Sequence, residues 1–202
     1  LVGLLGFIQR DLRQSGFQPV AFELRIDDRP DADDPDAPRV DPVELDDGAG
    51  HIVRIVGTVD RVDAMPLEKL GRTYLRVVDY KTGGKEFKLK EVYCGLDCQM
   101  LLYLFSLTRD GSGRFTGAEP AGVLYLLADP APENTTRANA ARSVEYKLDG
   151  LVRDEQKLFD AMDADETGRY LPFSYYKGAP SPYQKDKRAD IAKLNRIQLH
   201  LD

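Results

Sequence analysis

The stretch Val77-Val78-Asp79-Tyr80-Lys81 constrains this chain most strongly. The segment Tyr74–Lys81 is rich in β-branched and aromatic residues and becomes polar at its end, which is typical of a strand. Because residues two apart in a strand point to the same face, the Asp79 carboxylate and the Lys81 ammonium group would emerge side by side. Taken alone, such a pair is usually a surface salt bridge at a strand end.

An earlier apolar run, Ile52–Val62, also becomes polar near its end, at Asp60. The segment Ala64–Gly71 contains a proline and a glycine, so it would form a loop that folds the run back against Tyr74–Lys81 as an antiparallel neighbour. We therefore expect the two carboxylates and the ammonium group at the same end of one sheet.

Two carboxylates and an ammonium group in this arrangement suit metal-assisted hydrolysis of a phosphodiester bond. Adjacent carboxylates repel each other and favour a divalent cation between them. Oxygen ligands suit a hard ion such as Mg²⁺, which keeps several waters and binds substrate phosphate. Such an ion lowers the pKa of a bound water, and Lys81 would orient that water or stabilise the developing charge.

Three motifs in this order resemble the RecB-like branch of the PD-(D/E)xK nucleases: G-x-V-D-R-x-D at 57–63, V-V-D-Y-K at 77–81, and Q-x-x-x-Y at 99–103. Within that branch, the nuclease domain of AddB-type subunits of bacterial ATP-dependent helicase–nucleases is the most similar. Further segments that carry the likeness are Gly16–Glu23, Glu91–Tyr103, Asp149–Val152, Ala161–Asp163 and Tyr170–Pro172. The resemblance implies a restriction-endonuclease-like α/β fold, with a mixed sheet core flanked by helices.

The resemblance also implies catalytic roles for individual residues. Asp60 and Asp79 would hold the metal, and the backbone carbonyl of Tyr80 would add a ligand. Lys81 would act on the attacking water and the phosphate. Glu23, on the lead-in strand, would support the metal site, although an isolated strand glutamate is equally often a solvated surface residue.

Gln99 and Tyr103 are four residues apart and share one face of a helix expected over Glu91–Leu107. The resemblance implies that this pair helps to position DNA beside the catalytic residues. The alternative is that the tyrosine belongs to the core and the glutamine caps its polar edge.

Cys94 and Cys98 would lie one turn apart on one face of the same helix, in an orientation that does not favour an intrahelical disulfide. An iron–sulfur cluster usually needs four thiolates, and this chain has two cysteines. AddB-type proteins often carry such a cluster, but from cysteines at other places, so we expect any cluster to lie in the full-length protein outside this chain. The simpler interpretation of the pair is packing of small apolar residues.

The resemblance implies cofactors and partners as well. Mg²⁺ would be the metal, with Mn²⁺ as an alternative, and DNA would be bound as a single strand or an unwound duplex end. An AddA-type helicase–nuclease subunit would be the protein partner, and DNA exonuclease activity would process double-strand ends for recombinational repair. Two alternatives stay open: a catalytically inactive DNA-binding or scaffolding module on the same fold, and a Cas4-like or restriction-type nuclease.

The chain has 202 residues, which predicts a single domain, 1–202, with a sizeable core. It begins at Leu1 without methionine, and we interpret it as part of a longer protein.

The net charge of −6 is unusual for a free-standing nucleic-acid binder, which weakens the DNA interpretation without excluding it. Without an apolar run long enough to span a membrane, a cytoplasmic location and no membrane partner are expected. The sequence contains no G-x-x-x-x-G-K-[ST] motif, which would indicate a nucleotide-hydrolysing motor.

The remaining pattern completes the expected α/β fold. The nearly continuous apolar run Ala121–Leu127 predicts a central strand, parallel to Tyr74–Lys81 because a helix separates them. Other expected elements are a helix over Leu1–Arg13, a strand over Phe17–Ile26, a polar loop over Asp129–Asn139, a short strand over Ser143–Leu148 and a helix over Val152–Met162.

Two segments are expected to be less regular. Asp27–Gly50 is rich in Asp and Pro and is interpreted as a flexible acidic loop, with order only at Val43–Leu45. The tail 170–202 interleaves basic and aromatic residues, a combination that can bind single-stranded DNA, although we prefer a simpler interpretation. The same tail also has the pattern of an amphipathic helix, whose solvated face would account for these charges.

Overall fold

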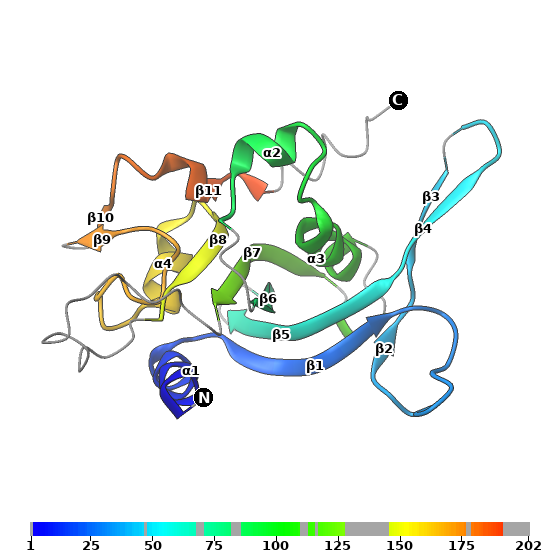
Figure 1. Ribbon diagram of the computed structural model, residues 1–202, viewed down its shortest axis with the longest axis horizontal. Helices are drawn as coiled ribbons and strands as arrows, with labels where there is room; N and C mark the ends of the chain where they lie inside the picture. Colours follow the sequence, from blue (N-terminus) through cyan, green and yellow to red (C-terminus); the bar gives the residue numbers. More distant parts are fainter. Residues whose placement is uncertain are drawn as a thin grey trace, which may run out of the picture.

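The computed structural model describes residues 2–46, 48–67, 71–81, 86–109, 113–115, 117–127, 146–176 and 179–191. In this part of the chain, seven strands form a mixed sheet in the order β11-β8-β7-β6-β5-β1-β2 (Figure 1). Its strands are β1 (Gln18–Ile26), β2 (Arg39–Val40), β5 (Gly57–Leu67), β6 (Arg72–Lys81), β7 (Ala118–Leu127), β8 (Leu148–Arg153) and β11 (Arg188–Ala189). The predicted α/β class is confirmed.

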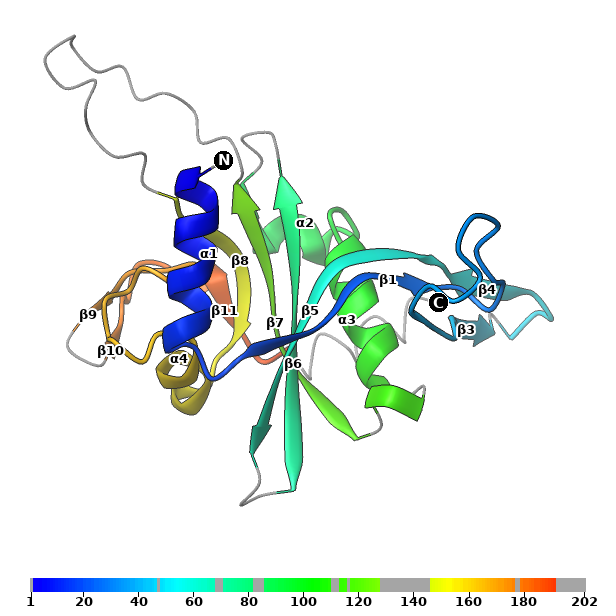
Figure 2. The same cartoon turned by 90° about the horizontal axis from the view of Figure 1, so that it is seen from below.

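Helices cover both faces of this sheet. The helices are α1 (Val2–Gln14), α2 (Leu89–Tyr93), α3 (Gln99–Arg109) and α4 (Gln156–Met162), with short 3-10 turns η2 (Gly113–Phe115) and η4 (Lys185–Lys187). Figures 1 and 2 show α1 and α4 on one side and α2 and α3 on the other. We call these the α1 face and the α3 face.

Each face of the sheet has its own hydrophobic core. On the α3 face, Leu101 and Leu104 of α3 pack against Leu75 and Val77 of β6. On the α1 face, α1 and α4 pack against the alternate residues of β6, among them Tyr74 and Val78. Because successive strand residues point to opposite faces, β6 separates the two cores.

The β5–β6 hairpin and the parallel pairing of β6 with β7 agree with the sequence predictions. The bounds predicted for the first strand of this hairpin, Ile52–Val62, were wrong. β5 continues through Pro66 to Leu67, where a loop was expected, and Ile52–Ile55 forms the separate strand β4. Pro66 is tolerated because β1 pairs with β5 only up to Ala64, so this end of β5 has a single neighbour.

The single helix predicted over 91–107 is instead two helices, α2 and α3. Gly95 and Asp97 have positive φ angles of 73° and 55° and break the helix between them. The predicted positions of the cysteines on one helix face are therefore wrong. Cys94 caps the end of α2, and Cys98 directly precedes α3.

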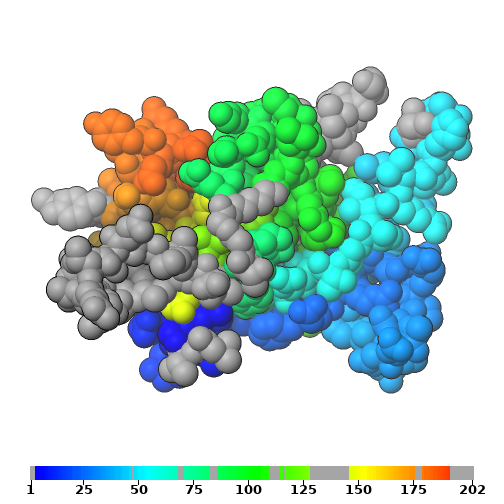
Figure 3. All heavy atoms as spheres, viewed as in Figure 1, coloured from blue at the N-terminus to red at the C-terminus, as the bar shows by residue number. Residues whose placement is uncertain are grey.

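The segment 27–50 contains more regular structure than the sequence indicates. β2 extends the main sheet beside β1, and β3 (Val43–Asp46) pairs with β4 (Ile52–Ile55) in a hairpin that projects from the body of the molecule (Figures 1 and 3). Asp27 accepts hydrogen bonds from both the backbone and the guanidinium group of Arg29.

The C-terminal third departs from the predicted bounds. β8 occupies Leu148–Arg153, and α4 begins only at Gln156, so the helix predicted from Val152 starts too early. Two further short strands, β9 (Tyr175–Tyr176) and β10 (Ala179–Pro180), pair with each other. The predicted loop over 129–139, residues 143–145 and the tail beyond Ile191 lie outside the described residues.

Candidate active site

Asp60 and the Asp79-Tyr80-Lys81 stretch meet at the end of the β5–β6 ladder. The last paired residues of that ladder are Arg61 and Val78. Beyond them, the Tyr80 backbone N–H donates a hydrogen bond of 2.9 Å to the Asp60 Oδ2 atom. A side-chain carboxylate thus replaces a backbone carbonyl, and it is held against the strand end that carries Asp79 and Lys81.

Asp60 lies where two strands lose their regular alternation. Val59 and Val62 of β5 both belong to the α3-side core, as do Ala21 and Leu24 of β1, although neither pair has the even spacing of a strand face. In β1, the irregular residue is Glu23, whose φ is 46°. Such local departures often redirect side chains beside functional sites.

Glu23 is level with Asp60 on the neighbouring strand, because Phe22 pairs with Arg61 and Leu24 with Val59. Its side chain is exposed, and it makes no hydrogen bond or ion pair to the described residues. The strand register thus brings this backbone to the site without a direct contact between the side chains.

Asp79 and Lys81 form a partly buried ion pair. Lys81 Nζ lies 2.8 Å from Asp79 Oδ2, and the two side chains are 34% and 16% exposed. The ammonium group also lies 5.9 Å from the ring centroid of Tyr125, which pairs in register with Asp79 across the parallel β6–β7 ladder. The predicted same-face arrangement of Asp79 and Lys81 is consistent with this contact.

Tyr125 and Asp149 continue the row of polar residues across the sheet, and sequence reasoning did not assign either of them to the site. Tyr125 pairs with Asp149 of β8. Burial, then the negative charges of Asp97, Asp79 and Asp149, raise the pKa of Tyr125, so its phenol stays protonated. Asp149 accepts a hydrogen bond of 2.6 Å from the Phe87 backbone N–H.

Gln99 and Tyr103 also lie at this end of the sheet. Gln99 Nε2 donates a hydrogen bond of 2.9 Å to the Tyr103 hydroxyl, whose ring is buried in the α3-side core. A Cβ atom on Gly57 would lie only 2.0 Å from that hydroxyl, so the ring packs directly on the β5 backbone three residues before Asp60. The geometry matches a core tyrosine with a glutamine at its polar edge.

The opposite face of the same hairpin carries a buried ion cluster, which we define as Asp11, Arg61, Asp63 and Arg76. All four are at most 3% exposed. Arg76 donates hydrogen bonds of 2.8 Å to Asp63 and 3.2 Å to Asp11, and Arg61 donates one of 3.0 Å to Asp63. The sequence contained a signal for this cluster, since Arg76 is the one charged residue within the run Tyr74–Val78.

The cluster is electrically balanced, with two arginines and two aspartates. Burial raises the pKa of Asp11 although the neighbouring Arg76 and Arg61 oppose this effect. For Arg76, burial acts to lower the pKa, but the charges of Asp11 and Asp63 outweigh it and raise the pKa. Arg76 therefore stays charged, as a buried guanidinium with two carboxylate partners should.

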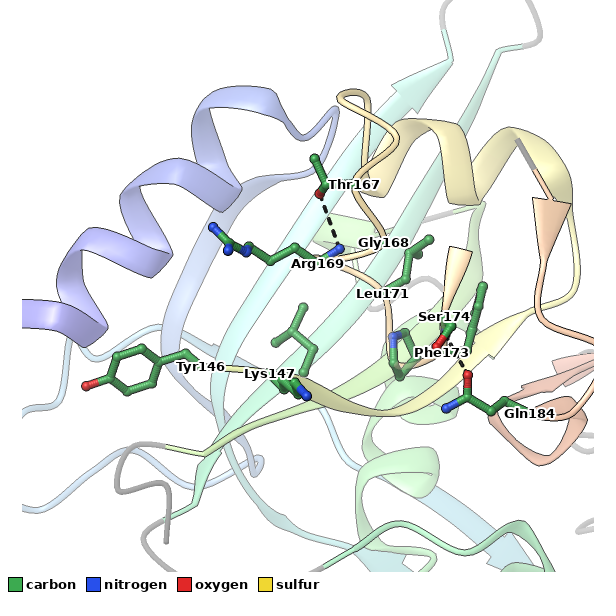
Figure 4. A pocket seen from close by; sticks show the side chains of 11 residues that line it. Tyr146, Lys147, Thr167, Gly168, Arg169, Leu171, Phe173, Ser174 and Gln184 are labelled. Carbon is green, nitrogen blue, oxygen red and sulfur yellow. Dashed lines mark hydrogen bonds between the residues drawn. The ribbon is translucent and has the colours of Figure 1, made fainter. Parts of the chain in front are cut away.

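A pocket of about 460 Å³ opens elsewhere on the molecule (Figure 4). Its lining residues are Tyr146, Lys147, Leu148, Thr167, Gly168, Arg169, Leu171, Pro172, Phe173, Ser174 and Gln184. Leu148, Leu171 and Phe173 belong to the α1-side core, so the pocket lies on the other face of the sheet from Asp79. It contains none of the predicted site residues.

The donors at the candidate site fit a hard divalent ion better than a soft one. Asp60, Asp79 and the Tyr80 carbonyl offer oxygen atoms only, which suits Mg²⁺ or Mn²⁺ completed by water and phosphate. Within the described ranges, no three His, Cys, Asp or Glu side chains are grouped closely enough to hold a metal by themselves. The two cysteines are unbridged and lie in the α2–α3 connection.

Comparison with known proteins agrees with this fold and arrangement of residues. The chain belongs to the PD-(D/E)XK nuclease superfamily, whose sequence model matches residues 3–192. It is similar to the B-type subunit of the ATP-dependent helicase/deoxyribonuclease from Symbiobacterium thermophilum, with 34% identity over 96% of this chain and 17% of the relative. Proteins of the same name from Clostridium botulinum and Acetivibrio thermocellus are 36% and 33% identical over 77% and 80% of the chain, and over 13% and 14% of their own length.

These relatives confirm the resemblance expected from the motifs. The chain spans 17% or less of the length of each of these three curated relatives. None of the described helices is long and apolar enough to cross a membrane.

Proposed function

We propose that this chain is a Mg²⁺-dependent deoxyribonuclease domain that hydrolyses DNA phosphodiester bonds within a helicase–nuclease. The observation that carries the proposal is the hydrogen bond from the Tyr80 N–H to the Asp60 carboxylate. It holds one carboxylate beside the strand end on which Asp79 and Lys81 lie together. Superfamily membership and the names of the relatives support the same activity.

In this proposal, Asp60, Asp79 and the Tyr80 carbonyl hold the metal. The ion, when bound, supplies charge neutralisation and a water of lowered pKa. Lys81 is placed to orient the attacking water or to steady the negative charge that develops on the phosphate. Its present ion pair with Asp79 keeps the ammonium group within reach of that charge.

Gln99, Tyr103 and Glu23 are assigned supporting roles. The Gln99 side chain is more exposed than the buried Tyr103 and is the better placed of the two to meet a DNA strand. Tyr103 fixes the distance between α3 and β5 through its contact with Gly57. Glu23, exposed and level with Asp60, would complete the metal shell through a water.

The wider biological setting rests on the relatives. We infer that DNA enters as a single strand or an unwound duplex end, that an AddA-type helicase–nuclease subunit is the partner, and that the role is DNA end processing for recombinational repair. The names of the relatives favour this setting over a Cas4-like or restriction-type nuclease. An exonuclease should degrade linear single-stranded DNA and spare closed circles of the same sequence.

The test compares cleavage by the full-length protein with that of Asp79→Asn, Lys81→Ala and Asp154→Asn. Asp154 is a matched control, because it is also ion-paired, 3.1 Å from Arg188, but lies at the far end of β8. We expect no Mg²⁺-dependent cleavage from Asp79→Asn, a loss of about 10²–10³-fold from Lys81→Ala, and wild-type cleavage from Asp154→Asn.

Calorimetric titration with Mn²⁺ provides the second measurement. Binding should be present in the wild type and absent in Asp79→Asn. If the wild type bound Mn²⁺ and DNA but did not cleave, the inactive scaffold would be the correct interpretation. Wild-type-like cleavage by Asp79→Asn would show that the metal site lies elsewhere.

A further inference from the structure

The nuclease motifs contain three residues that the proposed chemistry does not use: Arg61 and Asp63 of G-x-V-D-R-x-D, and the side chain of Tyr80 in V-V-D-Y-K. Arg61 directly follows Asp60, and Tyr80 lies between Asp79 and Lys81. All three side chains lie toward the α1 face, away from Asp79. They are nevertheless connected to the candidate site through the backbone.

Arg61 and Tyr80 contact each other directly. Arg61 Nη1 donates a hydrogen bond of 2.9 Å to the Tyr80 hydroxyl, and its guanidinium carbon lies 5.8 Å from the ring centroid. This bond joins β5 to β6 beyond the last backbone pair of the ladder, Arg61 with Val78. Side chains therefore hold the two strands together at the point where the backbone ladder has ended.

The Arg61 guanidinium is itself fixed in place. Its Nη2 donates to Asp63 Oδ2 at 3.0 Å, and its Nε lies 2.9 Å from Asp63 Oδ1. Asp63 is in turn bonded to Arg76, whose other partner is Asp11 of α1. Because these residues are at most 3% exposed, the guanidinium cannot shift without leaving a buried charge unpaired.

Two links therefore run from neighbouring residues of β5 to one residue of β6. The Asp60 carboxylate accepts the Tyr80 backbone N–H, and Arg61 donates to the Tyr80 hydroxyl. The first link lies at the candidate metal site, and the second lies on the opposite face. Together they leave the Tyr80 residue little freedom to rotate or to slide relative to Asp60.

We propose that Arg61 is a positioning residue that acts through the Tyr80 hydroxyl to hold Asp60, Asp79 and Lys81 in register. We call this contact the Arg61–Tyr80 clamp. Through this contact, the buried ion cluster on the α1 face restricts the movement of the metal ligands on the other face of the sheet. This inference rests on the proposed function, since it assigns a purpose to the register of those ligands.

The Tyr80→Phe variant tests the clamp, because it removes the hydroxyl and keeps the ring, the backbone N–H and the Arg61–Asp63 pairing. Tyr74→Phe is the matched control. Tyr74 lies on the same strand and the same face, and its hydroxyl also accepts a bond from a cation, Lys157 Nζ at 2.6 Å. It lies six residues from Tyr80, toward the other end of β6.

The first readout is amide hydrogen exchange at Tyr80 in the metal-free full-length protein. Tyr80→Phe should speed exchange of the residue-80 amide by about tenfold or more relative to its neighbours, because a bond to a charged donor is lost. Tyr74→Phe should leave that amide unchanged. The second readout is the Mn²⁺ concentration that gives half-saturation in calorimetry, which should rise in Tyr80→Phe alone.

Unchanged exchange at residue 80 together with unchanged Mn²⁺ affinity in Tyr80→Phe would overturn the clamp. Equal changes in both tyrosine variants would also overturn it, because they would show a general loss of stability. The proposed function fails separately, if wild-type protein neither binds Mn²⁺ nor cleaves DNA. A clamp failure is recognised by wild-type cleavage that Asp79→Asn abolishes and Tyr80→Phe leaves intact.

Discussion

The two faces of the β5–β6 hairpin carry similar charged residues in opposite conditions. On the α1 face, two arginines and two aspartates are at most 3% exposed and neutralise one another. At the candidate site, Asp60 accepts a hydrogen bond from the Tyr80 backbone N–H, and Asp79 is paired with Lys81, whose side chain is 34% exposed. Buried charges require partners that stay in place, whereas a site that receives a metal and a phosphate needs charged groups that solvent and ligands can reach.

The comparison predicts opposite consequences for two aspartates of the same hairpin. Asp63→Ala should lower the free energy of unfolding by about 3–5 kcal/mol, because it leaves buried Arg61 and Arg76 short of a partner. Asp79→Ala removes a partly exposed ion pair with Lys81 and should change that free energy by about 1 kcal/mol or less. Urea unfolding of both variants measures the difference.

Similar unfolding free energies for these two variants would contradict the distinction between the faces. DNA cleavage should rank the two variants in the opposite order when it is measured under conditions where both proteins are folded. Asp79→Ala should have none, and Asp63→Ala should retain part of it.

Gly57 allows a smaller test on the α3 face. Gly57→Ala should cost about 1–3 kcal/mol, because the new Cβ would lie 2.0 Å from the Tyr103 hydroxyl and must displace the ring. Combining it with Tyr103→Leu removes the atoms that clash. A double-mutant cycle should therefore be non-additive: the double variant should lose less unfolding free energy than the two single variants lose in total.

Additive effects in that cycle would show that Tyr103 does not pack against the glycine. Cleavage assays on the same variants sharpen the result. If Tyr103 only sets the distance between α3 and β5, the Gly57→Ala variant should lose cleavage in step with Tyr103→Leu.

The smallest effect is expected at an ion pair remote from both faces. The Arg29 side chain and backbone N–H hydrogen-bond to Asp27 and lower the pKa of that carboxyl to about 2. Because the pKa of Asp27 is lower in the folded state, its carboxylate stabilises the fold fully at pH values above the unfolded pKa of about 3.9. This stabilisation is lost as the pH falls through about 2. Carbon-detected NMR titration should place Asp27 near pH 2 in the wild type and higher in Arg29→Gln.

No change in the Asp27 titration on removing Arg29 would show that this pair is not formed in solution. Cleavage should be unaffected by Arg29→Gln at neutral pH, which makes the variant a control for the others.

The sequence predicted the framework of the site better than its details. Tyr74–Lys81 was recognisable by its β-branched and aromatic residues, and Ala121–Leu127 by the nearly continuous apolar run that is typical of a central strand. The conclusion that Asp60 and Asp79 share one end of the sheet was reached with the wrong strand bounds. It holds because β5 extends to Leu67, which puts Asp60 near the start of β5, level with the end of β6.

Other features could not be read from local pattern. The break between α2 and α3 depends on positive φ angles at Gly95 and Asp97, which the helical spacing of apolar residues over 91–107 does not reveal. The irregular alternation at Asp60 and Glu23 arises from the pairing of two strands, which no single segment encodes. The ion cluster needs Asp11 and Arg76, which are 65 positions apart.

That separation in the chain has a consequence for the order of folding. Arg76 and Asp63 are 13 positions apart and meet as soon as the hairpin closes, whereas the bond to Asp11 spans 65. Until α1 docks, the hairpin carries two guanidinium groups and one carboxylate at this place. Docking of the N-terminal helix therefore delivers the missing negative charge, and we expect the helix to join late, as a long-range contact drawn to an already formed cationic strand pair.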